Sequence, residues 1–337
     1  MDFQGFYQSL KENRIDKLYV FSGQEEFIKV SALRDLRKKI LPEGLEDMNE
    51  TLLDNPSVDA LIAAAETLPM LGERRLVVVR ECALLMSGKA RDEEAESARL
   101  AAYIPNLPDT TCVVFYCTAN PDKRKKLTAA LMKQACCVQF DPLDDVNLAK
   151  WMRGRLKVHG KTISPQNVQL LAFTSGRDLT QLSGEIEKLA SFSGDRTEIT
   201  QEDIQSVATR TVECSIFELM DALIAGKRAK SLELLSHLLE SGEQRIGILA
   251  MILRQYRQLL YLRLMMQDNL PQSEQMKRLS VSPFVYKRLL LQGKAYTIEQ
   301  LRGYVDLCVQ TDYAIKSGRM REDAALDRVI LLLEQRG

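Results

Sequence analysis

The sequence predicts an N-terminal α/β domain built on a parallel sheet, followed by two all-helical domains. In the first 142 residues, short apolar segments without polar alternation are separated by segments with helical spacing, which is typical of buried parallel strands joined by helices. From residue 143 onward the apolar residues follow a helical period. A length of 337 residues, 45% of them hydrophobic and 27% charged, suits two or three globular domains.

The elements of the first domain can be assigned in chain order. Residues 18–21 are a short apolar strand, residues 22–26 a turn, and residues 27–40 carry the spacing of a helix. Further strands are expected at 50–54, 76–80, 112–117 and 136–140. We therefore expect a parallel sheet with helices on both faces, in which the loop after the first strand is the place where a phosphate would bind.

This loop lacks the residues of a phosphate-binding P-loop. The GxxxxGK[ST] pattern supplies backbone amides and a lysine for the phosphates and a hydroxyl for magnesium. Here Gly23 is followed by Gln24, Glu25 and Glu26, and Arg80 ends a strand where a magnesium-binding aspartate would be needed. We expect no active NTPase, no cofactor and no metal site. The two glutamates fit a helix start better than a metal site, since acids there favour the helix dipole.

A Gly-Lys-Thr sequence at 160–162 is a second place where a phosphate site must be considered. Counted from Gly154, its spacing has one residue too many for a P-loop, and it follows a helix instead of a strand. We interpret Gly160 as the end of that helix, with Ser164 and Pro165 beginning the next one.

The rest of the chain divides into two predicted helical domains, so that the domains are 1–142, 143–210 and 211–337. The helices of the middle domain are expected near 145–158, 165–174, 178–192 and 201–208. Those of the last domain are expected at 216–224, 230–239, 246–266, from 282 onward, 298–315 and 324–333.

No group of residues forms a recognisable catalytic constellation. There are two histidines, and the seven cysteines contain no CxxC pair, which fits reduced thiols in the cytosol. Lys and Arg equal Asp and Glu at 46 each, so any DNA contact needs a local patch. Without a signal peptide or a membrane-spanning run, a cytoplasmic protein is expected. An enzyme whose site is assembled from scattered residues, such as a nucleotidyl transferase, stays an alternative.

The most informative segment is the turn Leu68-Pro69-Met70-Leu71-Gly72. A helix over 58–68 must stop near Pro69, and an apolar strand begins at residue 76. Turns usually carry polar residues at the surface, so the apolar pair Met70 and Leu71 has two interpretations. The pair either caps the core of its own domain or is presented to a partner.

The order of these parts resembles the delta subunit family of bacterial DNA polymerase III, the clamp-loader delta subunits. The resemblance covers essentially the whole chain, and no single motif decides it. It rests on the order and spacing of segments at residues 19–27, 66–79, 122–127, 178–189, 216–223 and 253–259.

The resemblance implies an AAA+-like first domain with a degenerate P-loop, a small helical lid domain and a helical collar domain. It implies a subunit that binds and opens the beta sliding clamp for loading onto primed DNA, without hydrolysing ATP itself. Its partners would be the beta clamp and the gamma/tau and delta-prime subunits. Such a subunit has no active site of its own, although the DNA polymerase III holoenzyme is a nucleotidyltransferase.

The resemblance also assigns site residues. The apolar plug that enters the clamp matches Met70 and Leu71, supported by Leu68 and Pro69, although many family members carry an aromatic residue at the second position. The nucleotide-sensing arginine of active relatives falls near Thr180. Candidates for DNA contact, from charge alone, are Arg254, Arg257, Lys316 and Arg319.

A delta-prime-like or other inactive scaffold subunit is the alternative within the same architecture. Delta-prime-like subunits usually carry a Ser-Arg-Cys motif and zinc-binding cysteines, which this chain lacks. Their absence favours delta.

Overall fold

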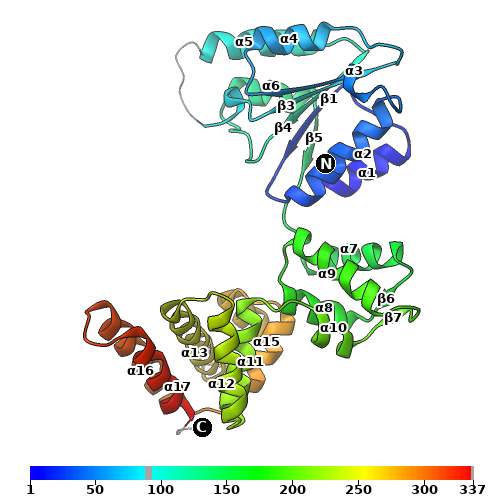
Figure 1. Ribbon diagram of the computed structural model, residues 1–337. Helices are drawn as coiled ribbons and strands as arrows, with labels where there is room; N and C mark the ends of the chain where they lie inside the picture. Colours follow the sequence, from blue (N-terminus) through cyan, green and yellow to red (C-terminus); the bar gives the residue numbers. More distant parts are fainter. Residues whose placement is uncertain (88–92, 335–337) are drawn as a thin grey trace. The chain divides into compact units, whose positions relative to one another are not determined.

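The computed structural model describes residues 1–87 and 93–334. The chain divides into two compact units, Met1–Asp144 and Asp145–Gly337, which are described separately (Figure 1).

The first unit is built on a parallel sheet with the strand order β2-β3-β4-β1-β5. The strands are β1 (Leu18–Ser22), β2 (Glu50–Asp54), β3 (Arg75–Arg80), β4 (Thr111–Tyr116) and β5 (Cys136–Gln139). Each was expected within one residue of these bounds, and the prediction of a parallel sheet is confirmed. β1, β3 and β4 are buried on both faces, as their continuous apolar sequences indicate.

Helices cover both faces of this sheet (Figure 1). They are α1 (Phe3–Lys11), α2 (Glu26–Ile40), α3 (Glu46–Asn49), α4 (Val58–Glu66), α5 (Glu93–Tyr103) and α6 (Lys126–Gln134), with short 3₁₀ turns at Ala83–Leu85 and Ile104–Asn106. On one face, Val77 and Val113 pack in a core with residues of α4, α5 and α6. On the other, Tyr19 and Phe21 pack edge-to-face against Phe6 of α1. Successive residues of a strand point to opposite faces of the sheet, so each strand contributes side chains to both cores.

The second unit begins with α7 (Asp145–Val158), α8 (Pro165–Ser175), α9 (Leu179–Phe192) and α10 (Gln201–Val207). Serine, aspartate and threonine side chains cap α8, α9 and α10 at their N-termini. A two-stranded parallel pair, β6 (Thr162–Ile163) and β7 (Glu198–Ile199), was not expected from the sequence. It joins the Gly-Lys-Thr segment to the loop after α9. There the buried Lys161 donates hydrogen bonds to the carbonyl oxygens of Gly194 and Arg196.

The remaining helices share one apolar core. They are α11 (Val212–Ile224), α12 (Arg228–Glu240), α13 (Arg245–Gln267), α14 (Gln272–Leu279), α15 (Pro283–Gly293), α16 (Ile298–Lys316) and α17 (Glu322–Glu334). The sequence interpretation missed α14. Phe173 of α8 packs against Phe217 of α11, with the ring centroids 5.2 Å apart, so α8 and α11 are in direct contact. Among the described helices, none is both long and apolar enough to cross a membrane.

Candidate functional site

The turn between α4 and β3 places its apolar side chains in solvent. The side chain of Leu68 is 73% exposed, that of Met70 56% and that of Leu71 85%. Of the large hydrophobic side chains in the described residues, Leu71 is the most exposed. The turn therefore does not cap the core of its own domain with Met70 and Leu71, and the interpretation that they face outward fits the structure.

Leu71 is also in an unfavourable backbone conformation. Its φ angle is +53°, in the left-handed region that residues with a Cβ atom rarely adopt. This conformation costs about 1–2 kcal/mol for a residue other than glycine. Because the Leu71 side chain makes little contact with its own domain, the cost is not offset by packing of that side chain. Strain of this kind persists where the surrounding structure imposes it, often at functional sites.

Backbone contacts on both sides hold the turn. Before Leu71, the side chain of Asn49 accepts a hydrogen bond from the Met70 N–H at 2.7 Å and donates one to the Met70 carbonyl oxygen at 2.9 Å. After Leu71, the chain runs against Pro42, where a Cβ atom on Gly72 would lie 3.0 Å from the Pro42 Cγ atom. The turn is thus anchored to the segment that links α2 to β2.

The loop after β1, where a P-loop fold would hold phosphate, is closed by its own chain. The φ angle of Gly23 is +118°, and a Cβ atom there would lie 2.1 Å from the Phe140 carbonyl oxygen. The same oxygen accepts a hydrogen bond from Glu25 N–H at 2.9 Å, and Phe140 N–H donates to the Ser22 carbonyl oxygen at 2.7 Å. The segment after β5 therefore lies directly against this loop. The backbone N–H of Glu25, which could otherwise face a phosphate, already donates a hydrogen bond to Phe140.

Lys29 of α2 lies beneath this loop, fully buried with 0% exposure. Its ammonium group donates to the carbonyl oxygens of Gly23 at 2.9 Å and Cys117 at 3.0 Å, and it pairs with the Glu26 carboxylate at 2.9 Å. Burial opposes ionisation of Glu26, but hydrogen bonds from Tyr116 and Lys29 outweigh it and hold the pKa of Glu26 below its usual value. A cation of the chain itself thus occupies the region beneath the loop and is fully coordinated.

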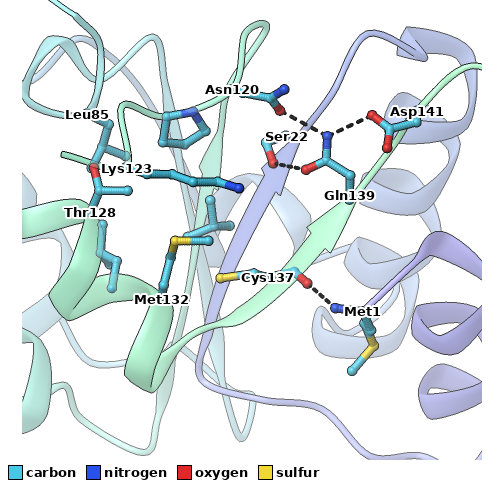
Figure 2. A pocket seen from close by; sticks show the side chains of 13 residues that line it. Met1, Ser22, Leu85, Asn120, Lys123, Thr128, Met132, Cys137, Gln139 and Asp141 are labelled. Carbon is cyan, nitrogen blue, oxygen red and sulfur yellow. Dashed lines mark hydrogen bonds between the residues drawn. The ribbon is translucent and has the colours of Figure 1, made fainter. Parts of the chain in front are cut away.

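A cavity of about 490 Å³ lies beside the ends of β1 and β5 (Figure 2). Gln139 binds three of its polar neighbours: Ser22 donates to it at 3.0 Å, and it donates to Asn120 at 3.0 Å and Asp141 at 2.8 Å. These groups satisfy one another, as the dashed lines in Figure 2 show, and most of the other lining residues are apolar. Among the described residues, no group of three or more His, Cys, Asp or Glu side chains could hold a metal ion.

Comparison with known proteins identifies the family. The family model for DNA polymerase III, delta subunit, matches residues 19–141, and that for the C-terminal domain of the delta subunit matches residues 213–333. The DNA polymerase III subunit delta of Bacillus subtilis (strain 168) is 30% identical over 334 residues, covering 98% of this chain and 96% of that protein. The chain belongs to the DNA polymerase III delta subunit family.

A solved structure agrees with this assignment. The Bacillus subtilis DNA clamp loader delta protein (YqeN) is similar with a TM-score of 0.61 and 29% identity, over 99% of each chain. The predicted parallel-sheet domain followed by helices is confirmed, and the delta interpretation is favoured over the delta-prime-like one.

Of the candidate DNA-contact residues of this delta family member, Arg254 and Arg257 lie on α13. Lys316 is the last residue of α16, and Arg319 lies in the turn after it; all four are exposed. Arg254 is 3.8 Å from the Glu213 carboxylate, and Lys316 is paired with Asp312 at 2.8 Å. The Arg319 guanidinium lies 5.5 Å from the centre of the Tyr313 ring. Arg257 is on the same helix as Arg254, one turn further along. Acidic neighbours accompany two of these cations, so their charge alone does not define a nucleic-acid surface.

Two residues that shape the site were missed in the sequence. Asn49 reads as an ordinary polar residue before a strand, and its partner Met70 is 21 positions away. Lys29 reads as a surface residue of an amphipathic helix, since lysine is almost never fully buried without partners. The amino-acid sequence contains no signal for the contacts of Asn49 or of Lys29, because both depend on tertiary packing.

Proposed function

We propose that this chain is the clamp-loader subunit that binds the beta sliding clamp and opens it for loading onto primed DNA, without hydrolysing ATP. The observation that carries the proposal is the turn at Leu68, Met70 and Leu71, whose apolar side chains are exposed on an anchored and strained backbone. Apolar side chains that enter a pocket on a partner are typical binding hot spots, and methionine adapts well to irregular pockets.

The closed loop at Gly23 supports the second part of the proposal. Phosphate binding at this loop would need free backbone amides and a cation directed at the ligand. In this chain the Phe140 backbone lies against the loop, and the ammonium group of Lys29 is used internally. Clamp binding would then be independent of nucleotide.

The helical parts would place this subunit in the loader. We propose that residues 143–210 form the lid domain and residues 211–337 the collar that contacts the gamma/tau and delta-prime subunits. Arg254, Arg257, Lys316 and Arg319 are the proposed contacts to primed DNA within that assembly. A cytoplasmic location follows from this role.

The direct test is binding of the purified chain to its cognate beta clamp, without ATP, beside the Met70→Ala/Leu71→Ala double variant. The proposal expects tight binding by the wild type and a loss on the order of a hundredfold in the variant, since each truncation removes about 1–3 kcal/mol. Met132→Ala and Leu291→Ala, which truncate exposed side chains elsewhere, are matched controls.

Opening is tested separately by release of a labelled clamp from closed circular DNA. The proposal expects the chain to speed release without ATP, and the double variant to lose this effect. If the folded wild type does not bind the clamp, the proposed role is wrong and the scaffold alternative stands. Binding that survives in the double variant would refute the assigned contact.

A further inference from the structure

The side chain of Asn49 is hydrogen-bonded to the backbone of the apolar turn. Asn49 is the last residue of α3, immediately before the edge strand β2, and its exposure is 0%. Its amide oxygen accepts from the Met70 N–H at 2.7 Å. Its amide nitrogen donates to the Met70 carbonyl oxygen at 2.9 Å and to the Leu45 carbonyl oxygen at 3.1 Å. Both donors of the amide group and one lone pair of its oxygen are therefore in use.

We propose that Asn49 is the positioning residue of the clamp-binding turn, which it holds in its binding conformation before the clamp arrives. This inference rests on the proposed function of Met70 and Leu71. Asn49 binds the backbone of Met70 as a neighbouring strand would, through one donor and one acceptor. This pairing fixes the peptide groups on either side of Met70 and thereby the direction in which the backbone continues to Leu71.

The strain at Leu71 explains why such an anchor is needed. The left-handed backbone of Leu71 is unfavourable, and its 85% exposed side chain does not stabilise it. The conformation therefore depends on the contacts that flank it, which are Asn49 on one side and the packing of Gly72 against Pro42 on the other. Without Asn49, we expect the turn to sample other conformations while the sheet beneath it stays folded.

The chemistry of the contact is specific to a neutral amide. An ionised carboxylate at this position could accept from Met70 N–H, but it would face the carbonyl oxygens of Met70 and Leu45 without a proton to donate. A protonated carboxyl group could accept from Met70 N–H and donate to one of the two oxygens. An Asn49→Asp variant should therefore regain the anchor as pH falls, because burial and the two carbonyl oxygens raise the pKa of the new carboxyl group.

The experiment compares Asn49→Ala with wild type in clamp-binding kinetics, using the full chain. We expect Kd to rise about tenfold, mainly through a slower association rate, because a smaller fraction of molecules holds the competent turn. Asn167→Ala is the matched control: it removes a side-chain hydrogen bond to a backbone carbonyl oxygen, that of Ile199 in the second unit. It should change the unfolding midpoint without changing Kd.

Two further readouts separate positioning from general stability. In the Met70→Ala/Leu71→Ala background, Asn49→Ala should have little additional effect on Kd, since both side chains of the turn that it positions are gone. As pH falls from about 8 to about 6, the Kd of Asn49→Asp should approach the wild-type value, while the Kd of the wild type stays constant. The isosteric aspartate variant also keeps the test valid if the alanine variant folds poorly.

Unchanged Kd in Asn49→Ala, or an effect of equal size in the Met70→Ala/Leu71→Ala background, would overturn the positioning role. Neither result would affect the clamp contact itself, which fails only if Met70→Ala/Leu71→Ala binds like the wild type. The two proposals are therefore refuted by different variants.

Discussion

Replacing Leu71 by glycine should make the protein at least as stable and much weaker in clamp binding. Glycine relieves the left-handed strain at φ +53°, a gain of about 1–2 kcal/mol, and adds conformational freedom to the unfolded chain, a loss of about 0.5–1 kcal/mol. Because the Leu71 side chain is exposed, its removal from the free protein costs little packing. The net expectation is a gain of about 0.5 kcal/mol in the free energy of unfolding.

Binding should respond in the opposite direction. Burial of a leucine side chain in a partner pocket contributes about 2 kcal/mol, which corresponds to roughly thirtyfold in Kd. Leu71→Ala is the matched variant, since it loses most of the apolar surface but keeps the Cβ atom and hence the strain. It should lose similar affinity without gaining stability.

Urea unfolding gives the stability, and titration against the clamp gives the Kd. A stability loss above about 1 kcal/mol in Leu71→Gly would show that the side chain packs within its own domain. An unchanged Kd would show that Leu71 is not in the interface. Either result would refute the reasoning from exposure and strain.

Three other predictions concern the rest of the chain. Lys29→Met should lower the free energy of unfolding by about 3 kcal/mol, because it leaves the buried oxygen atoms that bind Lys29 without a donor. Lys126→Met on the surface should change this free energy by less than about 0.5 kcal/mol, and urea unfolding measures both. Hydrogen bonds from Arg196 hold the pKa of Asp203 below its usual 3.8, so its stabilisation is present above that pH and is lost as pH falls further. The stability difference between wild type and Asp203→Asn should therefore narrow in acid, and a constant difference would contradict this. Five cysteine side chains are buried, and burial raises the pKa of each of their thiols; they are Cys82, Cys112, Cys117, Cys214 and Cys308. Ellman's reagent at about pH 8 should leave these five unmodified until the chain unfolds, and prompt reaction would contradict their burial.

Most of the fold could be predicted because its signals are local. The strands at 75–80 and 111–116 are apolar without alternation, and serine or threonine residues mark several helix starts. The helix α1 was not assigned from the sequence, and the other missed elements are short or polar. α14 has few apolar residues, and the two-residue strands β6 and β7 exist only because distant segments meet. Strands of that length have no period that a sequence can display.

The candidate site could be predicted only in part. Met70 and Leu71 stand out because apolar residues in a turn are unusual. The strain at Leu71 and the bonds from Asn49 do not, since a φ angle and a contact across 21 positions are properties of the folded chain. Burial of Lys29 was likewise not predicted, because its three oxygen partners are supplied by the loop, the end of β4 and α2 itself.

The ammonium group of Lys29 is a cation that is covalently part of the chain and so cannot dissociate from the loop at Gly23 as a bound ligand can. A nucleotide is bound, cleaved and exchanged, and each step offers the surrounding loops a different set of contacts. A side chain attached to α2 offers the loop at Gly23 the same contacts at all times. The contacts of Lys29 therefore favour one arrangement of the loop at Gly23 whether or not a nucleotide is present. The proposed function without ATP therefore predicts that compounds that compete with ATP do not change clamp binding by this subunit.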